Sequence, residues 1–255
     1  MTTTFCIIST GRNCSKWLEK SLGSIEEQDY PKDFVRVCVT DDCSSDGSAN
    51  IIQEFARRNL WSCYLNGQRK YALANQYNAI HDICKDNMDV VVFVDQDDWL
   101  NGPNVLKKLD EVYSDPNVLL TYGSYATNPP GLEGQQPAVR PMPAHVVRTR
   151  DFRSFQEKNG IYWNHLRTFR YGPFKMINRS ELQYPDGRGF FTASPDTAIM
   201  TPMMELVGDR HRMLTDHLLV YNTMQDEPDW RTHLPQIQEA DAIIYSLPKK
   251  ELWDA

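Results

Sequence analysis

The sequence lacks an apolar run long enough to span a membrane, and 41% of its 255 residues are apolar while 24% are charged. This composition predicts a soluble globular chain with no transmembrane segment, long enough for one large domain or two small ones. An excess of basic residues is also missing, because 27 Lys and Arg face 34 Asp and Glu, for a net charge of -7. Proteins that bind nucleic-acid backbones concentrate Lys and Arg, so we expect no nucleic-acid partner.

CxxC pairs and a secretory signal are absent as well. The six cysteines lie in the first third of the chain, several of them inside apolar runs, which predicts small core residues without a disulfide framework or zinc site (Cys6, Cys14, Cys38, Cys43, Cys63 and Cys84). The opening residues, MTTTFCIIST, contain neither the basic segment nor the cleavage site of a signal peptide. These absences predict a reducing, cytoplasmic location.

The first half of the chain alternates short apolar runs with helical patterns, which is typical of strand–helix–strand units around a parallel sheet. Five runs are predicted to be strands, at residues 5–10, 34–40, 61–65, 90–94 and 118–122. The run 90–94, VVVFV, is apolar at every position, which predicts a central strand buried on both faces. We therefore expect an α/β fold with a mostly parallel central sheet flanked by helices.

The regular alternation stops after the fifth strand. Residues 128–143 contain five prolines and few apolar residues, which predicts a long connection or flap. It separates a first half, residues 1–127, from a second half, residues 128–255. The second half is at first aromatic and basic, and then contains a predicted helix at 196–207 and a predicted strand at 218–222.

Three carboxylates follow the buried strand directly, in Asp95-Gln96-Asp97-Asp98. In open α/β sheets, ligands bind beyond the carboxyl ends of the strands. Neighbouring carboxylates repel one another unless a cation lies between them, and Mg²⁺ or Mn²⁺ favours carboxylate and phosphate oxygens. The segment therefore predicts a site for a metal ion and a diphosphate, and an acidic turn that caps a strand is its alternative reading.

Other polar segments should meet at the same edge of the sheet. Asp42, after the second strand, is a candidate to accept hydrogen bonds from a base or a ribose. Thr10 ends the first strand and Arg12 comes shortly after it, while Lys70 follows the third strand; the two cations could contact a nucleotide or its phosphates. Asp46 or Ser48 is expected to cap the next helix.

In this order and approximate spacing, the segments resemble the GT-A glycosyltransferases of the inverting family 2 group. The matching stretches are CIISTGRN, SLGSIEEQDYP, VCVTDDCSSDGS, ALANQYNAI, VVVFVDQDDWL and TYGSY, which cover about residues 4 to 125. The ordered series is more specific than any one motif. The resemblance implies a GT-A fold and the transfer of a sugar from a nucleotide-diphosphate donor, UDP- or GDP-linked, to a glycan or glycoconjugate acceptor.

The resemblance also implies roles for the acidic residues. It places Asp42 near the base, Asp95 near the ribose, and Asp97 or Asp98 on a Mn²⁺ or Mg²⁺ ion. The sequence departs from the family at Gly11, where many relatives carry an aromatic residue, and at Cys43, where a glycine is common.

Inversion requires an acceptor hydroxyl to lose its proton as it attacks, and a carboxylate is the usual base. In similar enzymes the base begins a helix shortly before the C-terminal strand, and Asp196 is the best counterpart here. An acidic residue in a first helical turn also complements the helix dipole without any catalytic duty. Asp186, Asp209 and Asp216 remain competitors for the role of base.

The segment from Trp163 to Arg170, WNHLRTFR, is dense in groups that hold sugars, because it offers an aromatic platform and several hydrogen-bond donors. It resembles the acceptor side of this group, including relatives from large DNA viruses, which implies acceptor binding by Trp163, His165 and Arg167. The alternative is that these are core or solvated residues. His217 and His233 are candidates to reach the metal.

The sequence predicts a metal-dependent inverting glycosyltransferase. Two alternatives stay open. One is a sugar-phosphate nucleotidyltransferase, although these enzymes normally carry a glycine-rich loop after the first strand. The other is a non-catalytic protein that binds a nucleotide sugar or a glycan.

Overall fold

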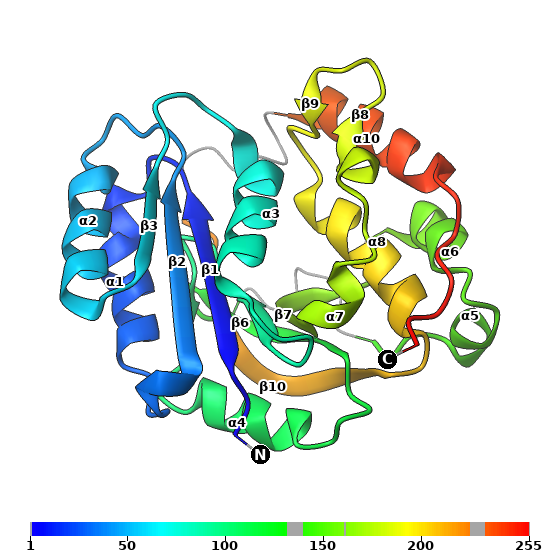
Figure 1. Cartoon of the computed structure of the whole chain (residues 1–255), viewed down its shortest axis with the longest axis horizontal. Helices are drawn as coiled ribbons and strands as arrows, with labels where there is room; N and C mark the ends of the chain where they lie inside the picture. Colours follow the sequence, from blue (N-terminus) through cyan, green and yellow to red (C-terminus); the bar gives the residue numbers. More distant parts are fainter. Residues whose placement is uncertain (1, 132–139, 161, 225–232, 255) are drawn as a thin grey trace.

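The computed structural model describes residues 2–131, 140–160, 162–224 and 233–254. One eight-stranded sheet runs through both halves of the sequence, in the order β3-β2-β1-β4-β7-β6-β10-β5. Helices cover both faces of this sheet, and a second helical layer formed by the later part of the chain lies beside it (Figure 1). The predicted α/β architecture is confirmed.

The first half forms the parallel part of the sheet. Its four strands are parallel and follow the predicted ranges within two residues: β1 (Phe5–Gly11), β2 (Val35–Asp41), β3 (Ser62–Leu65) and β4 (Val90–Phe93). They are connected through α1 (Ser15–Glu26), the short η1 (Lys32–Phe34), α2 (Ser48–Asn59) and α3 (Tyr71–Ile83). The helix α4 (Val105–Tyr113) follows β4 and the two-residue strand β5 (Trp99–Leu100).

Side chains of the central strands alternate between two apolar cores, as the pleat of a strand requires. Ile7 and Val92 pack in one core with Leu18 of α1, whereas Ile8 and Val91 pack in the other with residues of α3 and α8 (Pro195–Val207). All four residues of β4 are buried, as its uninterrupted apolar sequence predicts. The sheet edge that carries the polar loops is therefore built on a fully packed support.

The second half adds strands to the same sheet and then forms the second helical layer. The predicted strand at 118–122 corresponds to β6 (Leu120–Asn128), which ends at the boundary between the two halves. The strands added by the second half are β7 (Asn164–Arg170) and β10 (His211–Asn222), and β7 lies antiparallel between β4 and β6. The remaining elements are α5 (Ala144–Thr149), α6 (Phe152–Asn159), α7 (Tyr171–Phe174), η3 (Arg179–Leu182), the hairpin strands β8 (Gln183–Tyr184) and β9 (Gly189–Phe190), and α10 (Leu234–Ser246).

The sequence analysis did not predict β7, α6 or α10. The predicted flap at 128–143 lies largely outside the described residues, because 132–139 are not described. Among the helices of the described part of the chain, none combines the length and the apolar composition needed to cross a membrane.

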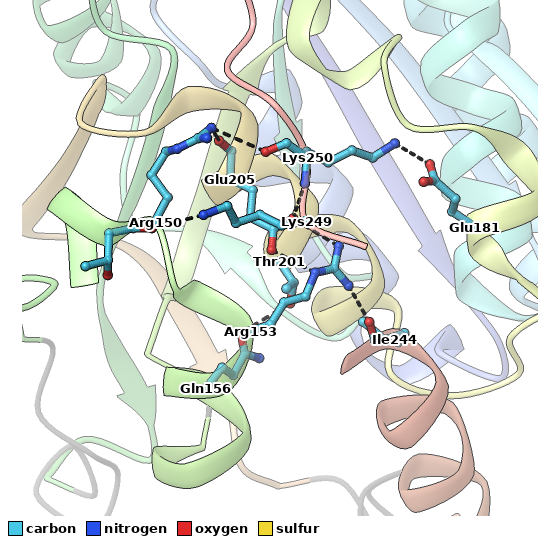
Figure 2. A network of polar contacts seen from close by, with 10 residues as sticks. Arg150, Arg153, Gln156, Glu181, Thr201, Glu205, Ile244, Lys249 and Lys250 are labelled. Carbon is cyan, nitrogen blue, oxygen red and sulfur yellow. Dashed lines mark hydrogen bonds and ion pairs between the residues drawn. The ribbon is translucent and has the colours of Figure 1, made fainter. Parts of the chain in front are cut away.

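A buried polar network holds α8 in place (Figure 2). Glu205 of α8 is 1% exposed and receives Arg153 of α6 through Nε–Oε1 and Nη2–Oε2 contacts of 2.7 and 3.0 Å. Arg153 also donates to the carbonyl of Ile244 in α10, and the Lys250 backbone N–H donates to Glu205 Oε2 at 3.0 Å. The buried carboxylate of Glu205 thus links α8 to α6 and to the C-terminal segment. Arg153, the residue of α6 in this network, also links α6 to α10.

Candidate functional site

The acidic loop after β4 sits at the carboxyl ends of the parallel strands. Gln96 is fully buried beneath it, and its side-chain Nε2 donates to the carbonyls of Thr40 at 2.9 Å and Ser9 at 3.4 Å. The Asp98 backbone N–H closes the turn by donating to the Asp95 carbonyl at 3.0 Å. Gln96 therefore attaches the acidic loop to the ends of β1 and β2.

Asp95, Asp98 and His165 form a cluster in which one possible ligand atom from each lies within 4.8 Å of the others. Asp98 is 1% exposed, and its Oδ1 accepts the Asn222 backbone N–H of β10 at 2.8 Å. Its other oxygen, Oδ2, is buried and has no hydrogen-bond partner within the described residues. Burial, followed by the charges of Asp97 and Asp95, holds the pKa of Asp98 well above its ordinary value.

A divalent cation fits this donor set. A buried carboxylate oxygen without a partner carries a large desolvation cost, which a bound cation would offset. Burial and the neighbouring Arg167 hold the pKa of His165 well below its ordinary value, so its imidazole is neutral and one ring nitrogen carries a lone pair. In this structure Arg167 Nη2 lies 3.2 Å from both ring nitrogens, so a metal ion bound by His165 would replace that contact. Tyr125 and Tyr221 flank the imidazole, with ring centroids 6.1 and 5.6 Å from that of His165.

The cluster differs in membership from the ligands that the sequence analysis predicted. Asp98 belongs to it, but its companions are Asp95, expected at the ribose, and His165, expected at the acceptor. Asp97 is half-buried in the same loop and is not a member of the cluster. His217, a candidate metal ligand, is exposed on β10. No sequence signal marked His165 as a neighbour of the acidic loop, because β7 was not predicted.

Asp42 joins the end of β2 to the start of α3. It is 4% exposed, and its carboxylate accepts the backbone N–H groups of Lys70 at 2.8 Å and Tyr71 at 2.9 Å and the side-chain amide of Asn66 at 3.0 Å. These bonds fix the loop that leads into α3. The carboxylate predicted to meet the base is thus already engaged by three donors.

The other predicted donor-binding residues lie at the same edge. Thr10 is buried near the end of β1, while Arg12 is exposed and its Nε donates to the Cys43 carbonyl at 3.4 Å. The exposed Lys70 presents its side chain to solvent. Asp46 precedes the N-cap residue of α2, Gly47, and accepts from both the backbone N–H and the hydroxyl of Ser48, the first residue of the helix, at 3.0 and 2.6 Å.

Gly11 ends β1 directly against Gln96. A Cβ atom at residue 11 would lie 2.6 Å from Gln96 Oε1 and 2.7 Å from its Cβ. Such distances are too short for real Cβ contacts, so a side chain at this position would displace Gln96. Gly11 therefore stands where an aromatic side chain would have no room, because the buried Gln96 side chain occupies the space above it.

Replacing Gly11 with alanine is expected to reduce the free energy of unfolding by about 1–3 kcal/mol, because the added methyl group overpacks a buried contact. Urea denaturation measures this loss. Gly67→Ala is the matched control, since a Cβ there meets no atom within 4 Å. Equal free energies of unfolding for the two variants would show that the Gln96 side chain can move away from the added methyl group without loss of stability.

Asp196 lies in the first turn of α8, and its side chain is 32% exposed. Its Oδ2 forms an ion pair of 2.5 Å with Nη1 of Arg167, whose Nη2 lies 3.2 Å from both ring nitrogens of His165. Arg167 thus connects Asp196 to the cluster.

The three competing carboxylates, Asp186, Asp209 and Asp216, are all exposed. Asp186 pairs with Arg188 at 2.6 Å, and Asp216 pairs with Lys108 at 3.3 Å. Neither of these two ion pairs involves a residue of the cluster or a residue in contact with it. Of these candidates, only Asp196 has a described contact that leads to His165.

Trp163 and Arg167 have different surroundings from those expected of acceptor ligands. Trp163 is 0% exposed and packs in the core with Phe152 and Phe169, so its ring offers no face to a sugar in this structure. The Arg167 side chain is 3% exposed and occupied by its ion pair. Trp163 directly precedes β7, and Arg167 lies on it. The polar residues of this strand do not predict its position in the middle of the sheet.

The mixed, helix-flanked sheet with an acidic loop at the carboxyl ends of its parallel strands matches the GT-A class of glycosyltransferase folds. The chain belongs to the family described as Glycosyl transferase family 2, whose pattern matches residues 6–183.

A curated relative is the poly(ribitol-phosphate) β-N-acetylglucosaminyltransferase TarS of Staphylococcus aureus strain Mu50, 28% identical over 121 residues. That alignment covers 44% of this chain and 20% of the relative, so the chain matches only about a fifth of that protein's length.

Two solved structures are similar to the whole fold. S. aureus TarS 1-349 in complex with UDP-GlcNAc has a TM-score of 0.61 at 17% identity, covering 88% of this chain and 60% of that one. The mannosyltransferase PcManGT from Pyrobaculum calidifontis, in complex with GDP-Man and Mn²⁺, has a TM-score of 0.62 at 18% identity, covering 98% and 66%. At these identities the likeness establishes the fold.

Proposed function

We propose that this chain transfers a sugar, with inversion, from a nucleoside-diphosphate sugar to a hydroxyl of a carbohydrate-type acceptor, and that it requires a divalent cation. The observation that carries the proposal is the Asp95–Asp98–His165 cluster at the carboxyl edge of the sheet, in which one Asp98 oxygen is buried and finds no hydrogen-bond partner among the residues that the structure describes. Complexes of the structural neighbours with UDP-GlcNAc and with GDP-Man and Mn²⁺ support the same class of donor.

In this proposal Asp98, Asp95 and His165 hold Mn²⁺ or Mg²⁺. Asp97, in the same loop, adds a further negative charge that attracts the cation. A cation bound there would offset the negative charge of the departing diphosphate. The first half of the chain, residues 1–127, binds the donor through the edge that carries Thr10, Arg12, Asp42 and Lys70. Since Asp42 is already held by three donors, its part is to fix the loop around the nucleotide.

The second half, residues 128–255, supplies the acceptor side. Asp196 accepts the proton of the attacking hydroxyl, while the acceptor oxygen forms its bond to the anomeric carbon opposite the departing diphosphate. The partial exposure of Asp196 leaves its carboxylate accessible to an acceptor. No covalent bond between sugar and enzyme is needed.

A thermal-shift panel of UDP-, GDP-, CMP- and dTDP-sugars, each with and without Mn²⁺, tests this function. One donor class is expected to raise the melting temperature, and to do so only when Mn²⁺ is present, because ligands that bind only the folded state stabilise it. The best donor is then assayed for transfer to glycan acceptors. Donor binding without transfer or donor hydrolysis would favour the non-catalytic alternative, and pyrophosphate release from a nucleoside triphosphate would favour the nucleotidyltransferase.

Asp196→Asn is expected to lower the transfer rate by at least about a hundredfold, in keeping with the loss of a general base. Its donor affinity in Mn²⁺ should stay close to that of the wild type, because the asparagine oxygen can still accept from Arg167. Steady-state kinetics and calorimetric titration separate the two effects. Full transfer activity in this variant would remove Asp196 from the mechanism.

A further inference from the structure

Arg167 is a buried cation that lies between the two parts of the candidate site. Its side chain is 3% exposed, with one terminal nitrogen 2.5 Å from Asp196 and the other 3.2 Å from both ring nitrogens of His165. Burying a guanidinium is costly unless an anion pairs with it, and Asp196 is the anion that the structure pairs with it.

The ion pair joins two layers of the fold. Arg167 lies on β7, in the middle of the sheet, whereas Asp196 lies on α8, in the layer beside it. Planar, forked guanidinium groups fix the direction of a carboxylate better than the compact ammonium of lysine does. The pair therefore sets where the Asp196 carboxylate stands relative to the sheet edge and to His165.

The same contacts leave Arg167 poorly placed to bind an acceptor. Its exposed surface is minimal, and one terminal nitrogen is occupied by Asp196 while the other lies against the His165 ring. Asp196, in contrast, keeps 32% of its side chain exposed. The accessible group of the pair is the carboxylate.

We propose that Arg167 is a positioning residue for the transfer reaction: it acts through Asp196, fixing the position of that carboxylate relative to the Asp95–Asp98–His165 cluster, and does not bind the acceptor. This inference rests on the proposed function. It replaces the acceptor-binding role predicted from the sequence for Arg167.

A double-mutant cycle on Arg167→Lys and Asp196→Asn tests the proposal. Alone, Arg167→Lys is expected to lower kcat by about 10- to 100-fold, because a misplaced catalytic group costs up to about a hundredfold in rate. Its donor Kd in Mn²⁺ and its acceptor KM should stay within about threefold of wild type. In the Asp196→Asn background, the same change should alter the residual rate by less than about threefold, since coupled residues are not additive.

Arg153→Lys is the matched control. Arg153 also pairs with a carboxylate of α8, Glu205, but at the other end of the helix and within the network of Figure 2. Any loss of melting temperature in this variant should come without a change of kcat, measured at a temperature where all variants are folded. A structural role for Arg167 would make the two lysine variants behave alike.

The outcomes that overturn the proposal are distinct. A raised acceptor KM with unchanged kcat would make Arg167 an acceptor ligand. Multiplicative effects in the cycle, or a failure of Arg167→Lys to fold where Arg153→Lys folds, would assign it a structural role. Failure of the wild-type chain to bind any nucleotide sugar with Mn²⁺ would instead refute the proposed function on which the inference rests.

Discussion

Asp98→Asn is expected to reduce sugar transfer by about a thousandfold or more, which corresponds to the several kcal/mol that metal-assisted charge stabilisation supplies to a transition state. The variant should also lose the Mn²⁺-dependent rise in melting temperature given by the donor. Asp98 is the cluster member with a buried oxygen that has no hydrogen-bond partner in the part of the chain that the structure describes, so the loss of its charge should weaken cation binding most.

The same substitution should stabilise the metal-free protein. Because the pKa of Asp98 is raised by burial and by Asp97 and Asp95, the folded chain holds this proton more tightly than the unfolded chain does. Between the ordinary aspartate pKa, about 3.9, and the raised folded value, the folded state carries the extra proton, and the free energy of unfolding falls as the pH rises. Asparagine carries no such charge, so the loss is absent from the variant.

Urea denaturation in EDTA from pH 4 to pH 8 measures this effect. The wild type and Asp98→Asn should have similar stability at the acid end, and the variant should be the more stable at the neutral end. Glu54→Gln, which removes an exposed acidic charge on α2, is the control and should not reproduce the difference. A wild type as stable as Asp98→Asn at pH 8 would contradict an unpaired buried charge at this position.

Arg153→Met is expected to reduce the free energy of unfolding by about 3–5 kcal/mol, because it leaves the Glu205 carboxylate buried without its paired charge. Glu205 is 1% exposed and receives two contacts from Arg153 of 2.7 and 3.0 Å. Loss of this pair also frees the Ile244 carbonyl and weakens the packing of α10. Urea denaturation again gives the measurement.

The double variant Arg153→Met/Glu205→Met separates a buried charge from general packing. Replacing both partners of a buried ion pair by apolar residues is often neutral or stabilising, so the double variant should recover at least about 2 kcal/mol over Arg153→Met. If the losses of the single variants Arg153→Met and Glu205→Met add up to that of the double variant, the pair itself contributes little and the side chains matter for their volume.

Part of the site was predictable because it is local in sequence. Asp95 to Asp98 directly follow the apolar strand β4, and Asp42 follows β2, so both had to lie at the carboxyl edge of a parallel sheet. The alternation of strands and helices specified that sheet before any tertiary contact was known. Local order also predicted that Asp196 begins a helix, as it does in α8.

The partners of these carboxylates were not predictable in the same way. β7 reads as polar because His165, Arg167 and Arg170 interrupt its apolar residues, yet it lies in the middle of the sheet. Arg170 is buried there because its guanidinium donates to the carbonyls of Tyr113 and Met88 at 2.7 Å and of Val118 at 3.1 Å. A hydropathy pattern cannot show that a charged side chain is buried when the carbonyls that satisfy its hydrogen bonds lie far away in the sequence.

By itself, the sequence determined the parallel part of the sheet, its acidic edge and the helix that carries Asp196, because the burial and the ends of these strands follow from the order of neighbouring residues. Only the tertiary structure decided that His165 joins Asp95 and Asp98, that Arg167 pairs with Asp196, and that Trp163 lies in the core. Those contacts join segments far apart in the chain, and their geometry depends on how the antiparallel strand inserts into the sheet and how α8 packs beside it.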